Sequence, residues 1–230
     1  MNKLFAPSII GLALASASTL AAAQASCSST GTVNVASTIV VSGTTYDGGC
    51  RTFNATSALG DGSQSEGQLP YFRVTNGTLR NVILGSNGAD GIHTYGNSTL
   101  TNITWRDVGE DAMTIKSSGT VNVSYITGWN AADKFFQANA ASTLNVNRAY
   151  INGAGKVYRQ NGGTTYPTAA TLNYAALYNV KEAVFRTDSS ASTARWASGG
   201  GASVNAVCRG YASGKCTVGS GVGGYSRVNY

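Results

Sequence analysis

The sequence contains little charge and little proline. Asp, Glu, Lys and Arg make up 11% of its 230 residues, whereas soluble domains usually contain about 25%. This shortage argues against a charged helical bundle or a coiled coil. Only 3 prolines accompany 29 glycines, a balance that suits many short strands joined by tight turns. The composition therefore predicts a single all-β domain, since 230 residues suffice for one sizeable core but not comfortably for two.

Long apolar runs are also missing after the first residues. No stretch beyond Leu20 approaches the ~18 apolar residues that suggest a membrane span, so we expect no membrane partner. The segment 1–25 has the pattern of a signal peptide, with Lys3, an apolar run from Ile9 to Leu20 and the cleavage motif Ala23-Gln24-Ala25. The sequence therefore predicts a secreted, extracellular domain that covers residues 26–230.

The basic residues form no cluster. Although the formal net charge is +6, Lys and Arg are scattered from Arg51 to Arg227 without interleaved aromatic residues. Nucleic-acid binding depends on basic patches that neutralise phosphates. We therefore expect a solvated basic surface and no nucleic-acid partner.

Four cysteines are present, an even number that indicates disulfides in an oxidising compartment. Three pairings are possible. The pairing of Cys27 with Cys50 and of Cys208 with Cys216 is the most local of them and would fasten both ends of the domain. It is our preferred prediction, and the other two pairings stay open.

A short motif of Thr, an apolar residue and Asn recurs along the chain, beginning at Thr78, Thr99, Thr120, Thr143 and Thr171. The intervals between these starts are 21, 21, 23 and 28, and the dense leucine pattern of leucine-rich repeats is missing. A right-handed parallel β-helix fits better, because equivalent positions of its coils stack in columns about 4.8 Å apart. The Gly-rich and Ser-rich segment from about residue 198 is expected to cap this solenoid, with a flexible linker as the alternative.

Acidic residues gather in one window, and the repeat predicts how they stack. An apolar column inside the solenoid is expected to contain Ile92, Met113, Phe135 and Val157. Its polar neighbours Asp90, Asp111 and Asp133 would then lie on three consecutive rungs, with Asp107 and Glu110 beside the middle one. Stacked carboxylates repel one another unless a cation neutralises them. An oxygen-rich cluster without sulfur favours Ca²⁺; a row of solvated turn aspartates is the alternative.

Cations follow the acids in register. Lys134 and Lys156 are one period of the repeat apart and should lie on adjacent rungs, and Arg159 follows shortly after Lys156. Positive charge on Lys156, Arg159 and a nearby Ca²⁺ is expected to lower the pKa of Lys134, so Lys134 is predicted to act as a base. Strict alternation along a strand would send Lys156 and Arg159 to opposite faces, so this arrangement requires a bend between them.

A site with Ca²⁺, two lysines and an arginine suits a polyanion rich in carboxylates, such as polygalacturonate. Its C5 proton lies α to a carboxylate, and binding that carboxylate to cations stabilises the negative charge that develops when the proton leaves. Elimination of the C4 oxygen then gives a 4,5-unsaturated sugar. The acidic residues alone also permit hydrolysis by a pair of carboxylates.

Four motifs carry a specific resemblance: Gly91-Ile92-His93, Trp105-Arg106-Asp107-Val108-Gly109-Glu110-Asp111-Ala112, Asp133-Lys134-Phe135-Phe136-Gln137 and Gly155-Lys156-Val157-Tyr158-Arg159. From about Tyr46 to Asp188 the chain resembles polysaccharide lyase family 3, the small secreted pectate lyases. The resemblance implies a parallel β-helix and Ca²⁺-dependent β-elimination of pectate. It further implies roles in substrate binding and catalysis for Lys134, Lys156 and Arg159, and a metal site formed by Asp90, Asp107, Glu110 and Asp111.

Three further positions have open roles. Glu66 lies in a stretch that also resembles the family; it is a candidate for the acid that protonates the leaving oxygen, or an exposed turn residue. His93, the only histidine, suits packing or the edge of the substrate site better than catalysis. Lys116 is a second candidate for substrate binding. Whether Lys134 or Arg159 removes the proton stays open.

We expect a monomer that binds polygalacturonate. The alternative to a lyase is a secreted β-helical module that binds pectate or another acidic polysaccharide without cutting it. Both need the same cationic groove, so only turnover separates them.

Overall fold

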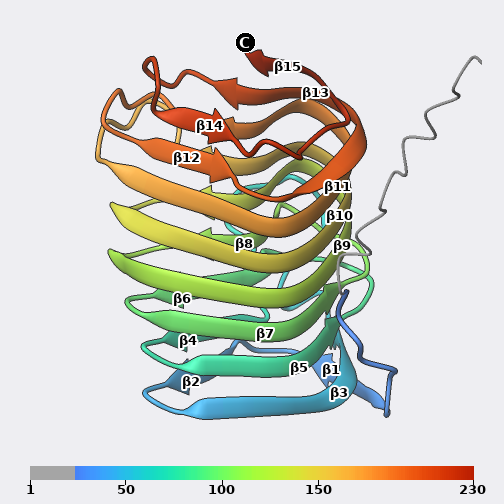
Figure 1. The fold of residues 1–230 in the computed structure, drawn as a ribbon. Helices are drawn as coiled ribbons and strands as arrows, with labels where there is room; N and C mark the ends of the chain where they lie inside the picture. Colours follow the sequence, from blue (N-terminus) through green and yellow to red (C-terminus); the bar gives the residue numbers. More distant parts are fainter. Residues whose placement is uncertain (1–23) are drawn as a thin grey trace, which may run out of the picture.

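In the computed structural model, which describes residues 24–230, the chain winds into a stack of coils (Figure 1). Except for Gln24 and Ala25, the predicted signal peptide lies outside the described residues. Every described strand pair is parallel. The part of the chain that the structure describes has no helix, and hence none long and apolar enough to cross a membrane. The expected all-β parallel β-helix is confirmed.

The strands differ widely in length. Their bounds are β1 (Thr32–Val35), β2 (Ile39–Ser42), β3 (Thr45–Ala55), β4 (Phe72–Thr75), β5 (Thr78–Leu84), β6 (Ile92–Tyr95), β7 (Ser98–Trp105), β8 (Asp111–Ile115), β9 (Gly119–Ala138), β10 (Ser142–Gln160), β11 (Thr168–Arg186), β12 (Thr193–Trp196), β13 (Gly199–Arg209), β14 (Cys216–Val218) and β15 (Tyr225–Asn229). Except from β8 to β12, paired strands are not consecutive in sequence, because each coil pairs with the coil before it. One path runs β1-β3-β5-β7-β9-β10-β11-β12-β14, and a second runs β2-β4-β6-β8-β9.

The longest strands turn corners without breaking. β9, β10 and β11 have 19 or 20 residues each and curve around the solenoid in Figure 1. At one corner Tyr125, Arg148 and Tyr174 stack in the same column, all with left-handed φ of 50–62°. A single left-handed residue interrupts an extended strand and redirects it, so one long strand contributes to several faces.

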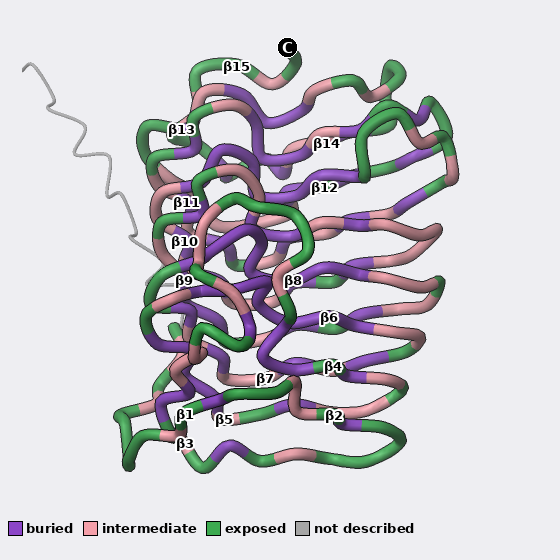
Figure 2. Tube along the Cα trace, turned by 180° about the vertical axis from the view of Figure 1, so that it is seen from behind, coloured by how far each residue is buried: buried purple, intermediate pink, exposed green. Residues whose placement is uncertain are grey.

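Buried residues, purple in Figure 2, recur along the stack, and most of them are apolar. The predicted column begins as expected, with Ile92 opposite Met113. It then continues through Phe136 and Tyr158, one residue beyond the predicted Phe135 and Val157. The shift arises between β8 and β9, where Met113 pairs with Phe136; from Phe136 to Tyr158 the spacing is again the predicted one.

Two of the predicted repeat alignments also shift, each by two residues. Thr99 lies opposite Asn122 rather than Thr120, and Thr171 lies opposite Asn145 rather than Thr143. Because side chains alternate with a period of two, a shift of two keeps every side chain on its face. The hydrophobic pattern therefore tolerates this change of pairing.

Both ends of the described coils are fastened by disulfides. Cys27 pairs with Cys50 and Cys208 with Cys216, which confirms the preferred pairing. The segment from about residue 198, predicted as a cap, contributes β13, β14 and β15 at one end of the stack (Figure 1).

Candidate functional site

Four carboxylates converge at the coils that precede β6 and β8. This acid cluster consists of Glu66, Asp90, Glu110 and Asp111. Burial, Asp90 and Glu66 together raise the pKa of Glu110 to about 7, against a smaller opposing effect of Lys134. Burial likewise raises the pKa of Asp111 to about 7; Lys134 opposes the shift, and Asp90 and Glu110 add to it. The cluster therefore holds more negative charge than its surroundings compensate.

Two members of the acid cluster are anchored by the residue three positions further along the chain, His93 in β6 and Thr114 in β8. His93 Nε2 lies 2.6 Å from Asp90 Oδ2, and His93 is only 8% exposed. One coil later, Thr114 donates a hydrogen bond of 3.3 Å to Asp111 Oδ2. His93 and Thr114 are register partners, so the same position orients an acid on two successive coils. The structure thus places His93 behind Asp90, at the edge of the site.

The acid cluster suits a hard cation but does not enclose one by itself. The buried Asp111 Oδ1 has no hydrogen-bond partner among the described residues, and Lys134 Nζ is 3.6 Å away. Within residues 24–230, no three acidic, histidine or cysteine side chains are spaced to hold a metal ion alone. Because Ca²⁺ takes ~6–8 oxygen ligands, further oxygens from a ligand or water would have to complete such a site.

One column of the solenoid begins with an acid and continues with two cations. Asp111, Lys134 and Lys156 occupy equivalent positions in it on β8, β9 and β10. The predicted stacking of the two lysines is confirmed. The predicted stacking of Asp133 on Asp111 is wrong, because the register between β8 and β9 is one position longer than expected and brings Lys134 opposite Asp111.

Asp133 instead forms ion pairs with both lysines. It contacts Lys134 Nζ at 3.0 Å and also pairs with Lys156 Nζ. Although burial opposes the shift, hydrogen bonds from Lys156 and Lys134 lower the pKa of Asp133. This carboxylate is therefore a partner of the cations, and its predicted role as a metal ligand has no support in these contacts.

Two β-bulges explain the geometry around Lys156. Between matching pairs, β9 and β11 each have one residue more than β10 at this corner. The bulges expose Asp133 on one side of Lys156 and Glu182 on the other, and Glu182 Oε2 lies 3.2 Å from Lys156 Nζ. Gly155 allows the close approach, because a Cβ there would lie 2.5 Å from the Asp133 carbonyl oxygen. Bulges commonly re-aim side chains at functional sites in this way.

The protein groups around Lys134 move its pKa upward, whereas the predicted lowering included a nearby Ca²⁺. Burial alone would lower it, but the charges of Asp111, Asp133 and Glu110 raise the pKa of Lys134 above its ordinary value. The sequence argument counted the neighbouring lysine and did not foresee that three carboxylates surround this one. With the acid cluster ionised, Lys134 is a cation.

Arg159 extends the site on the far side of the lysines. Its Nη2 lies 2.7 Å from Asp188 Oδ2, which also accepts a hydrogen bond of 2.9 Å from the Gly163 backbone. The Arg159 residue is 7% exposed, and its Nη1 is buried without a partner in the described part of the chain. The hydrogen bond from Arg159 is the largest of the effects that lower the pKa of Asp188.

Two predicted residues lie apart from these contacts. Asp107 is exposed, and its charge acts on the hydroxyl group of Tyr71. Lys116 follows the end of β8 and forms no ion pair with any residue of the range 24–230.

Glu66 is an exposed turn residue whose carboxyl group lies beside that of Glu110. The functional roles proposed for these residues stay predictions.

The sequence argument missed Glu182, Arg186, Asp188 and Arg209. Glu182 Oε1 binds Arg186 Nη1 at 2.6 Å and Arg209 Nη1 at 2.7 Å. Arg159, Arg186 and Arg209 share one column on β10, β11 and β13. Following the position of Arg159 through the coil of Thr171 and one coil further would have identified this column. We call Lys134, Lys156 and these three arginines the basic strip.

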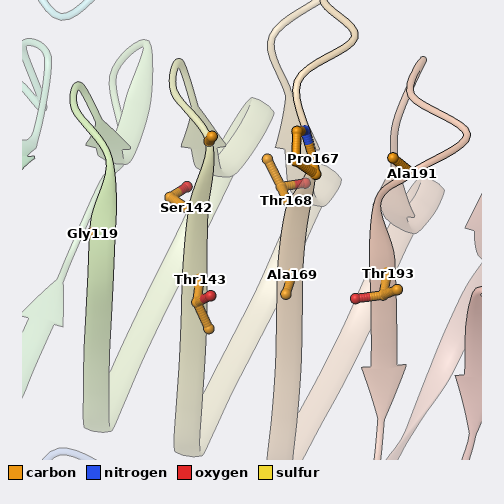
Figure 3. Close-up of a pocket in the computed structure, with 9 residues that line it drawn as sticks. Gly119, Ser142, Thr143, Pro167, Thr168, Ala169, Ala191 and Thr193 are labelled. Atoms are coloured by element: carbon orange, nitrogen blue, oxygen red, sulfur yellow. The ribbon is translucent and has the colours of Figure 1, made fainter.

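A cavity of about 390 Å³ lies elsewhere, over the first residues of β9 to β12 (Figure 3). Small and hydroxyl side chains line it, among them Ser142, Thr168 and Thr193. None of its nine lining residues is charged. It therefore offers none of the groups that binding or deprotonating a uronate requires, and the candidate site is the open charged surface.

Comparison with known proteins agrees with this geometry. A family model described as "Pectate lyase" matches residues 23–216. The chain is 33% identical over 162 residues to "Probable pectate lyase E" of Aspergillus clavatus, which covers 68% of this chain and 63% of that protein. It spans between about half and two thirds of the length of the curated relatives it matches.

Two solved structures share the fold. The catalytic domain of pectate lyase PelI from Erwinia chrysanthemi superposes with a TM-score of 0.60 at 22% identity, over 86% of this chain and 98% of that one. PelI in complex with tetragalacturonic acid superposes with a TM-score of 0.58 at 22% identity, over 89% and 72% of the two chains.

Proposed function

Because the chain belongs to the pectate lyase family, we propose that it is a secreted enzyme that cleaves polygalacturonate by Ca²⁺-dependent β-elimination. One observation carries this proposal: an oxygen-rich acid cluster lies directly beside lysines on successive coils. That arrangement matches a substrate whose carboxylates need cations and whose C5 proton needs a base. PelI, which binds tetragalacturonic acid in its complex, supports the substrate class. Two disulfides suit an extracellular protein.

The acid cluster is the proposed calcium site. Asp90, Glu110 and Asp111 offer carboxylate oxygens, and the buried Asp111 Oδ1 has no hydrogen-bond partner among the described residues. Bound Ca²⁺ supplies positive charge that polarises a substrate carboxylate and offsets the acids around Lys134. His93 and Thr114 contribute by holding Asp90 and Asp111 in place.

Lys134 is the proposed base. It is the member of the basic strip closest to the acid cluster, so neutralising Asp111 and Glu110 would lower its pKa more than that of the other cations. Arg159 is a poor alternative, since an arginine does not lose its proton in proteins. Its buried guanidinium, like Lys156, instead suits binding a substrate carboxylate and stabilising the negative charge that develops at C5 and the carboxylate.

Proton return completes the elimination. As the C5 proton moves to Lys134, the C4–O bond breaks, the C4–C5 double bond forms, and the departing oxygen takes up a proton. Glu66 lies at the edge of the acid cluster, exposed to solvent, and is the proposed donor; water is the other source. No water nucleophile is consumed, which distinguishes this reaction from hydrolysis.

The ultraviolet absorbance of the 4,5-unsaturated product tests the proposal. We expect it to rise when the protein acts on polygalacturonate with Ca²⁺ at alkaline pH and to stop rising when a chelator is added. Lys134→Ala should lower kcat by about 10²–10⁴-fold, the usual contribution of a positioned base, whereas the exposed Lys215→Ala should not. A folded protein that binds the polymer without producing this absorbance would instead be a binding module.

A further inference from the structure

Arg159, Arg186 and Arg209 form a straight row along the axis of the solenoid. They are register partners on β10, β11 and β13, so their backbones are spaced about 4.8 Å apart, as neighbouring strands are. Arg186 and Arg209 lie on the two coils beyond the predicted catalytic residues. The basic strip therefore continues past the place where the reaction is expected.

A single carboxylate holds the end of this row. Glu182 contacts Arg186 Nη1 at 2.6 Å, Arg209 Nη1 at 2.7 Å and Lys156 Nζ at 3.2 Å. One negative charge thus faces three positive charges. On its other side, the Cζ atom of Arg209 lies 4.4 Å from the ring centre of Tyr230, a cation–π contact that helps to fix the guanidinium. These contacts orient the arginines without neutralising them.

Positive charge is also in excess around Arg159. Asp188 pairs with its Nη2 at 2.7 Å, while Nη1 is buried without a partner among the described residues. Lys156, Arg159, Arg186 and Arg209 are four cations, and three carboxylates face them: Asp133, Glu182 and Asp188. Unpaired guanidinium donors and excess charge favour anionic oxygens from outside the protein.

We propose that Arg186 and Arg209 bind carboxylates of the same polygalacturonate chain beyond the reacting sugar, so that the polymer lies along the solenoid axis. This inference rests on the proposed substrate. Glu182 is a positioning residue, because it acts through the arginines and Lys156. From the coil of Lys134 to that of Arg209 there are three rung steps, or about 14 Å, a span that a polymer covers and a two-sugar fragment does not.

Binding as a function of chain length tests this inference. Arg209→Ala and Arg186→Ala are compared with Arg195→Ala, which removes an exposed arginine of the neighbouring strand β12. Calorimetry measures Kd for digalacturonate and for polygalacturonate with Ca²⁺ present, and the wild type and every variant carry Lys134→Ala so that the polymer is not cleaved. We expect Kd for the polymer to rise about tenfold in each site variant, equivalent to losing one charge-assisted contact. The increase for digalacturonate should be much smaller, and Arg195→Ala should match the wild type.

Two outcomes would overturn the inference: an equal loss of affinity for both ligand lengths, or no loss beyond that of Arg195→Ala. Thermal unfolding of each variant excludes a folding defect, and Arg209→Lys, which keeps the charge, should recover part of the affinity. Because this readout is binding, it also separates the two hypotheses. A protein that binds the polymer through Arg209 but never cleaves it would refute the lyase proposal and support the arginine site.

Discussion

The acid cluster and the basic strip contain the same kind of carboxylate with opposite electrostatic behaviour. In the acid cluster, burial and neighbouring acids raise the pKa values of Glu110 and Asp111 to about 7. Along the basic strip, burial is outweighed by Lys156 and the arginines, which lower the pKa of Glu182; the pKa of Asp188 is also lowered. The pKa values of acids only a few coils apart thus shift in opposite directions, because their charged neighbours differ.

This difference gives the solenoid a polarity along its axis. The first coils of the site hold uncompensated negative charge and are suited to a cation. The following coils hold uncompensated positive charge and are suited to an anion. A calcium-bridged polyanion needs both, in this order and side by side.

The largest expected effect comes from removing one charge of the acid cluster. Asp111→Asn should abolish calcium-dependent turnover, yet raise the free energy of unfolding by on the order of 2 kcal/mol at pH 8 in chelator, since ionising this buried acid costs stability. Chemical denaturation measures the change. Asp61→Asn, at an exposed position, is the control and should give no increase. A less stable Asp111→Asn variant would show that the carboxylate stabilises the fold and would contradict the comparison.

The pH dependence of stability is the second test, measured in chelator. Glu110 and Asp111 have raised pKa values, so the folded state binds more protons than the unfolded state between about pH 4 and 7. The free energy of unfolding should therefore fall as pH rises through that range. The lowered pKa values of Asp133, Glu182 and Asp188 act in the opposite direction, and their stabilisation should disappear as pH falls below about 4.

These two slopes predict a stability maximum in mildly acidic solution. Asp111→Asn should flatten the decline between pH 4 and 7 without altering the loss in acid. If stability instead rises steadily to neutral pH in the absence of metal, the acid cluster is compensated by groups outside these contacts, and the contrast between the two regions fails.

The smallest expected effect on stability is at the half-exposed ion pair between Asp188 and Arg159. Asp188→Asn breaks the ion pair with Arg159, but the Asp188 side chain is 40% exposed. Solvent screens such pairs, so the free energy of unfolding should fall by only about 0.5 kcal/mol. Arg159 also loses the carboxylate that orients its guanidinium. KM for polygalacturonate should therefore rise, although the fold is barely destabilised. A loss of several kcal/mol would show that this pair is structural and not part of a binding surface.

The repeat allowed the architecture and much of the site to be predicted. Its nearly constant period brought Lys134 and Lys156 to adjacent coils, as found, and the even cysteine count led to the observed disulfides. Where the repeat was not extended, Arg186 and Arg209 were missed. The position of Asp133 could not be predicted, because it depends on a bulge that no composition or period reveals.

By itself, the sequence determined the parallel β-helix, the apolar interior and the gathering of acids and lysines on a few coils, because side-chain alternation and a nearly constant period act along the whole chain. Only the tertiary structure decided which charges meet. The register between β8 and β9 is one position longer than the period predicts, and it brought Lys134 rather than Asp133 level with Asp111. The pKa of a buried group depends on contacts within a few ångströms. Replacing an acidic neighbour by a basic one through a register change of one position therefore reverses the direction of its pKa shift.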